Sequence, residues 1–137
     1  MSILQTQTTS FKAELYQAVH NLTTDTLKVA LYTGNADLNE TTTVYTTSNE
    51  VTGGGYPPGG VQLTGVTINT SGYTAYVNFN NANFSAAVTA RCALIYNYSK
   101  GNKSIAVLDF GSDKTSTSFT LTMPTNTPTT ALLRSSV

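Results

Sequence analysis

The stretch ARCALIYNY, residues 90–98, is followed by SKGN and then by SIAVLDF, residues 104–110. In the first stretch, Cys92, Leu94 and Tyr96 fall on one face of an extended chain, and Ala93 and Ile95 fall on the other. Both faces are apolar, which is typical of a central strand covered on each side. The intervening glycine and asparagine predict a turn. We therefore expect two consecutive strands here, the first of them central.

Similar short patterns occur on either side of this pair. Strands are predicted at residues 26–32, 41–47 (an edge strand), 61–70 (with a bulge at Gly65), 73–79, 90–98, 104–110, 119–123 and 130–133, with turns at 69–72 and 111–114. Short alternating strands at this spacing favour two packed layers over a closed barrel. The sequence thus predicts a mainly β protein, a single-domain β-sandwich of jelly-roll or Greek-key type.

One short N-terminal amphipathic helix is predicted at residues 11–21. Ser10 is the expected N-cap, and Phe11, Leu15 and Val19 recur at helical spacing on one side. Residues 1–9 have no periodic pattern and are expected to form a flexible N-terminal arm. Residues 10–137 then form the β-sandwich domain, interrupted by a long Gly/Pro-rich loop at 33–60.

The composition excludes several classes of function. The chain contains 26 threonines, only 10% of its residues are charged, and its formal net charge is zero. Without a basic surface we expect no nucleic-acid partner. Without a long apolar run or a signal-peptide pattern we expect no membrane association and folding in a cytoplasm.

Few side chains offer chemistry. The chain has one His and one Cys, and we interpret His20 as structural and Cys92 as a buried small hydrophobe. Acidic groups at 37–40 and 109–113 are candidate calcium ligands, but aspartates in glycine turns ordinarily accept hydrogen bonds from backbone N–H groups. We therefore predict a protein that is not an enzyme and has no catalytic residue, cofactor or metal.

The segment GGGYPPGG, residues 53–60, is the most distinctive loop. It lacks the Gly-Lys-Ser/Thr ending of a phosphate-binding loop. Its Tyr-Pro-Pro centre favours a stiff extended conformation that presents an aromatic ring. A flexible loop without a partner remains the alternative. The predicted protein-interaction residues, drawn from this loop, residue 45 and the N-terminal arm, are Ile3, Leu4, Tyr45, Tyr56, Pro57 and Pro58.

The order of motifs resembles small structural proteins of tailed bacteriophages. The similarity lies in the helix, TDTLKVALYT (24–33), VYTTSNEV (44–51), the glycine-rich 53–60, ALIYN (93–97), SKGN (99–102) and AVLDFG (106–111). The resemblance implies a noncatalytic virion component, foremost a capsid cement or decoration protein. Such a protein is made in the cytoplasm of the bacterial host and binds the outside of the capsid. Its expected partners are the major capsid protein and copies of itself, as a dimer or trimer.

A second function remains open within this resemblance. The chain is alternatively a tail or fibre module that binds a host-surface glycan through exposed Tyr and Asn side chains. Copy number separates the two, because decoration places many copies on the head and a tail role places a handful at the tail.

Overall fold

The computed structural model describes residues 2–136, which form one mainly β domain with a single short α-helix. In chain order the elements are β1 (Thr6–Gln7), α1 (Thr9–Tyr16), β2 (Leu27–Tyr32), β3 (Val61–Gln62), β4 (Thr67–Ser71), β5 (Thr74–Asn78), β6 (Ala82–Asn83), β7 (Val88–Asn97), the 3-10 turn η1 (Tyr98–Lys100), β8 (Lys103–Ser116), β9 (Thr120–Leu121) and β10 (Leu133–Ser135). The predicted β-sandwich-like class is confirmed.

The main sheet has the order β1-β8-β7-β2-β3, and all its pairs are antiparallel. β7 lies at its centre, as predicted, and residues 92–97 are buried. Neighbours that are distant in sequence, such as β2 with β7 and β1 with β8, require long connections. The sheet is therefore not a simple meander.

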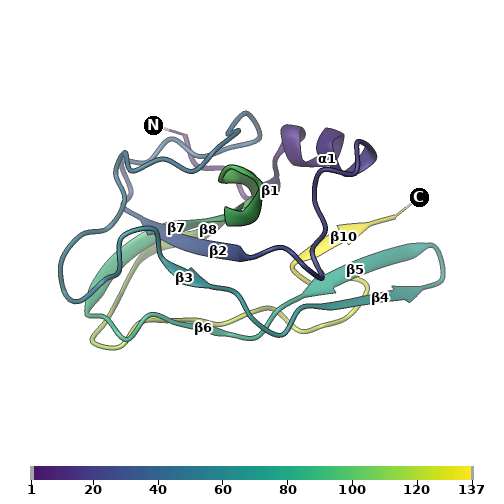
Figure 1. Cartoon of the computed structure of the whole chain (residues 1–137). Helices are drawn as coiled ribbons and strands as arrows, with labels where there is room; N and C mark the ends of the chain where they lie inside the picture. The colour runs from purple at the N-terminus through teal and green to yellow at the C-terminus, as the bar shows by residue number, and fades with distance from the viewer. Residues whose placement is uncertain (1, 137) are drawn as a thin grey trace.

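Of the two smaller sheets, β6-β9 lies below the main sheet, and β10-β5-β4 lies at its right in Figure 1. Alternate residues of the 82–90 segment are buried, and Phe84 packs with Tyr56 and Phe119 between the layers. The predicted alternation of Phe119, Leu121 and Met123 toward the core is confirmed.

The opposite face of the main sheet is covered by the 33–50 segment (Figure 1). Ala36 and Leu38 from this segment pack with Leu94 and Tyr96 of β7 in a second apolar cluster. This explains why both faces of residues 90–98 are apolar.

The helix is shorter than predicted. α1 spans Thr9–Tyr16, and its N-cap is Thr8, whose hydroxyl accepts a hydrogen bond from the Phe11 N–H, rather than Ser10. Ala18 has a φ of 57°, a left-handed conformation that a continuing helix does not adopt. Phe11 is the one buried residue of α1. Thr8 also reaches Ser104 through its hydroxyl at 2.9 Å, so a tertiary contact determines where the helix begins.

Residues 2–9 are not separate from the domain, so the expected boundary at residue 9 has no counterpart. Thr6 and Gln7 pair with Val107 and Ala106 of β8, and the Leu4 N–H donates to the Leu38 carbonyl. β1 lies on the outer side of β8 and hydrogen-bonds backbone groups of β8 that would otherwise be unpaired.

Four local predictions need correction. The 61–70 segment does not bulge at Gly65 but divides there, because β3 joins the main sheet and β4 joins the three-stranded sheet. The hairpin turn is at residues 72–73 rather than 69–72. The 41–47 segment makes only an isolated bridge, Val44 to Lys103. Residues 111–114 do not turn; β8 continues through them with a shifted register, because β7 extends to Val88 and offers backbone partners.

Candidate interaction surface

Tyr56 is part of the core rather than the surface. It is only 6% exposed, and its hydroxyl donates to Glu50 Oε2 at 2.6 Å and accepts from the Leu31 N–H at 3.0 Å. Burial, followed by the neighbouring Glu50 carboxylate, raises the pKa of the Tyr56 hydroxyl above its usual range. Of the two following residues, Pro57 is half-buried and Pro58 is exposed.

Glu50 is the centre of a hydrogen-bond network that holds the 33–60 segment. It accepts from the Tyr45 hydroxyl at 2.5 Å and from the Gly59 N–H at 2.9 Å, in addition to Tyr56. Tyr96 stacks on Tyr45 and donates to the Gly59 carbonyl at 2.6 Å. Burial raises the pKa of Tyr96 to about 12. All these hydroxyls remain protonated donors at neutral pH, so the network anchors the segment to β2 and β7.

The other predicted interaction residues are also partly half-buried and partly exposed. Tyr45 is half-buried in its stack with Tyr96, and Ile3 is half-buried beside Leu38. Leu4 is 48% exposed. Leu4 and Pro58 are thus the two of the six that stay on the surface, and Tyr45 and Tyr56 meet through the half-buried Glu50 carboxylate.

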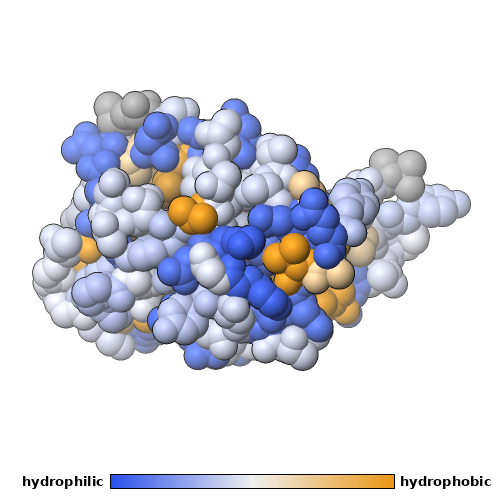
Figure 2. Space-filling view, turned by 45° about the horizontal axis from the view of Figure 1, so that its top comes forward, coloured by the Kyte–Doolittle hydropathy of each residue, from blue (hydrophilic) through white to orange (hydrophobic). Residues whose placement is uncertain are grey.

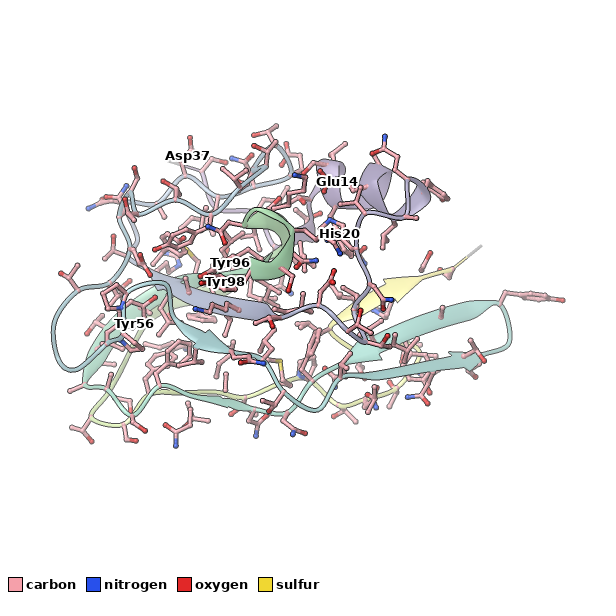
Figure 3. The ribbon with its side chains drawn as sticks, in the orientation of Figure 1. Glu14, His20, Asp37, Tyr56, Tyr96 and Tyr98 are labelled. Carbon is pink, nitrogen blue, oxygen red and sulfur yellow. The ribbon has the colours of Figure 1, made fainter. Side chains whose placement is uncertain are left out.

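His20 lies in a second polar network, next to Glu14 below α1 (Figure 3). Its side chain is fully buried, with Nε2 2.8 Å from Glu14 Oε1 and Nδ1 2.9 Å from Asn97 Nδ2. The amide nitrogen of Asn97 can only donate, so His20 Nδ1 accepts and His20 Nε2 carries the proton donated to Glu14. This geometry ties α1 to the end of β7.

Asp25 extends this network. Asn97 Nδ2 and Lys100 Nζ donate to its carboxylate at 2.8 and 2.9 Å. Burial alone would raise the pKa of Asp25, but hydrogen bonds from the Asn21 backbone, Asn97 and Lys100 outweigh burial and lower it to about 2. The cluster therefore stabilises the connection between α1, β2 and η1.

Acidic groups weighed as calcium ligands serve local roles. Asp109 pairs with Arg91 Nε at 3.3 Å and accepts from the Gly111 N–H at 2.8 Å. Among residues 2–136, no cluster of three or more His, Cys, Asp or Glu side chains is placed to hold a metal ion. The helix within this range is too short and too polar to cross a membrane.

The most exposed aromatic and aliphatic side chains were not among the predicted residues. Tyr73 is 87% exposed at the tip of the β4–β5 hairpin, Ile68 on β4 is 49% exposed, and Tyr16 at the end of α1 is 94% exposed. The hairpin projects beyond the main sheet at the right of Figure 1. At its base, a groove of about 170 Å³ between α1 and the three-stranded sheet is lined by Leu15, Leu22, Val77 and Leu133.

A simple sequence signal marks this region. Residues 51–90 and 115–133 contain no Asp, Glu, Lys, Arg or His, and they supply β3 to β6, β9 and the first residue of β10. Figure 2 shows strongly hydrophilic residues on the body of the molecule and pale residues on the projecting end. We call β4, β5 and their turn the uncharged hairpin. The sequence alone shows that this hairpin is uncharged, but it does not show that the hairpin projects from the body of the molecule.

Comparisons with known proteins identify no relative. No family model matches the chain, and neither a curated protein nor a solved structure shows detectable similarity to it.

Proposed function

We propose that the protein is a virion structural protein, a capsid decoration protein that binds the outer surface of the major capsid protein shell and stabilises the head. Two observations support this proposal. The order of motifs resembles small structural proteins of tailed bacteriophages. The uncharged hairpin presents Tyr73, 87% exposed, on a regular ladder that projects from the body. The exposed Tyr73 is the observation that carries the proposal.

The chemistry of the uncharged hairpin favours a protein partner. Tyrosine is enriched in the centres of protein interfaces because its ring is apolar and its hydroxyl can still bond. A side chain held by a hairpin loses little conformational freedom on docking. A symmetric shell offers the same docking site to every copy, so the stabilisation contributed by each bound copy is repeated over the particle.

The direct test is binding to purified heads that lack the protein. We expect Tyr73→Ala to weaken binding by roughly tenfold or more, the effect of removing a central interface tyrosine. Tyr98→Ala is the matched control, because Tyr98 is also exposed, at 55%, but lies on η1. Equal binding by parent and Tyr73→Ala would contradict the proposal that the uncharged hairpin attaches the protein.

Salt and copy number provide independent readouts. Since the hairpin is uncharged, binding should change less than about threefold between roughly 0.05 and 0.5 M salt. Labelled particles should carry many copies on the head. A handful of copies at the tail, with retention of the isolated protein on a host-glycan surface, would instead support the tail or fibre module.

A further inference from the structure

The sheets of this protein end in edges of different kinds. The outer edge of β10 is partly covered, because the Gln7 side chain donates to the Arg134 carbonyl at 2.9 Å, and it carries the charge of Arg134. β3, β6 and β9 are two residues long. β4 spans five residues, all exposed, and within residues 2–136 it pairs with β5 alone. Residues 108–116 of β8 also have no strand on their outer side among residues 2–136, but they carry Asp109, Asp113 and Lys114. β4 is thus the exposed edge that carries no charge.

β4 also lacks the features that ordinarily protect an edge. Such edges carry Lys or Pro, or a bulge that breaks the ladder. β4 reads Thr-Ile-Asn-Thr-Ser, with no charge and no proline, and its register with β5 is unbroken over five pairs. Its β-branched residues favour the extended state. The strand is thus suited to accept another strand.

The turn shows which backbone groups are free. Gly72, with a φ of 57°, occupies the first position of the two-residue loop, which is typical of a type II′ turn. Such a turn closes on a hydrogen-bonded pair, here Ser71 with Thr74, so alternate residues of β4 bond β5. Ile68 and Thr70 then direct their N–H and C=O groups outward.

We propose that β4 pairs antiparallel with β4 of a second copy across a two-fold axis at Asn69. In this register Ile68 of each copy faces Thr70 of the other, so the four free N–H groups meet four free carbonyls. The two three-stranded sheets become one six-stranded sheet. An antiparallel edge is self-complementary, and the absence of charge in residues 51–90 means that the approach opposes no like charges.

This inference rests on the proposed function in that copies of the chain are among its expected partners, but it concerns the isolated protein. It is therefore tested without particles.

The test is sedimentation of the full chain at up to about 1 mM. A strand pair of this size is in the range of transient interfaces, so we expect a dimer with a dissociation constant of roughly 100 µM. Asn69→Lys and Asn69→Asp each place two like charges directly opposite one another, which should raise the dissociation constant at least about tenfold. A mixture of the two variants should form a heterodimer at least as stable as the parent dimer. This rescue requires residue 69 to face its own copy.

Asn35→Lys is the control, since it makes the same change at an exposed residue of the 33–50 segment and should leave the dimer intact. Circular dichroism confirms that each variant is folded. A monomeric parent at 1 mM, an Asn69→Lys variant that dimerises like the parent, or a mixture that fails to associate would each overturn the pairing. If the parent is monomeric but Asn69→Lys reduces binding to heads, the edge serves the capsid protein, which overturns self-pairing and leaves the proposed function standing.

Discussion

The 33–60 segment and the uncharged hairpin have opposite relations to the core. The 33–60 segment has no regular strand, yet it buries Ala36, Leu38 and Val51 and covers one face of the main sheet. The hairpin is a regular ladder, yet all of β4 is exposed. Regular hydrogen bonding therefore does not indicate burial, and glycine-rich sequence does not indicate exposure. A segment is buried when side chains such as Glu50 anchor it over apolar surface.

The sharpest test of this contrast replaces one tyrosine in each region. Tyr56→Ala should lower the free energy of unfolding by about 4 kcal/mol, because it leaves a large cavity beside Phe84 and removes hydrogen bonds to Glu50 and Leu31. Tyr73→Ala should change it by less than about 0.5 kcal/mol. Urea unfolding measures both. Similar losses would mean that Tyr56 does not belong to the core.

Glycines in the two regions should also differ. In Gly60, with a φ of 83°, a Cβ would lie 1.8 Å from the Val29 carbonyl oxygen, so Gly60→Ala should displace the loop and cost about 3 kcal/mol. In Gly72, with a φ of 57°, a Cβ would meet no atom within 4 Å. Gly72→Ala should therefore cost only the backbone strain, about 1 kcal/mol. Thermal unfolding ranks the two, and a reversed order would contradict the described packing of residues 59–60.

Removing the anchor of the 33–60 segment should loosen that segment in particular. Glu50→Ala deprives two tyrosine hydroxyls and the Gly59 N–H of their acceptor, at a cost of about 2–3 kcal/mol. Limited proteolysis should then cleave within residues 33–60 before the hairpin. Glu40→Ala, at an exposed carboxylate, should change stability by less than about 0.5 kcal/mol. Unaltered proteolysis of Glu50→Ala would show that the apolar contacts alone hold the segment.

The smallest expected effect concerns acid. Because the pKa of Asp25 is lowered from 3.8 to about 2, its ionised form stabilises the fold at pH values above 3.8, and this stability disappears as the pH falls through 2. The parent should lose about 2 kcal/mol from this source between pH 5 and pH 2. Asp25→Asn should lack this loss, whereas Asp113→Asn, at an exposed position of β8, should retain it. Equal acid sensitivity in all three proteins would contradict the Asp25–Lys100 pairing.

The elements predicted correctly were those specified by neighbouring residues. The alternation in residues 90–98 and the SKGN turn locate β7 and the start of β8, because a strand with two apolar faces has few other stable arrangements. The turn predicted at residues 111–114 was wrong, because glycine and aspartate are found in β-bulges as well as in turns. Which of the two forms depends on β7, whose Val88 and Thr89 continue the ladder.

In the candidate site, too, contacts with distant residues decide what neighbouring residues do not specify. Tyr56 and Tyr73 both stand next to glycine, and local sequence does not distinguish them. The Tyr56 hydroxyl donates to the Glu50 carboxylate and accepts from the Leu31 N–H of β2. No element covers Tyr73 among the residues described, because the chain leaves the main sheet at Gly65 and places the hairpin beyond it.

Four properties follow from the order and composition of the residues: the β class, the central strand, the absence of charge from residues 51–90 and the shortage of catalytic groups. Those properties depend on composition and on contacts between near neighbours. The packing of distant segments places β1 beside β8, about 100 residues away, lets Glu50 anchor the Gly/Pro-rich loop, and leaves β4 with a free edge among residues 2–136. These outcomes depend on which distant segments satisfy one another's backbone groups and apolar faces, and that choice is made only when the whole chain packs.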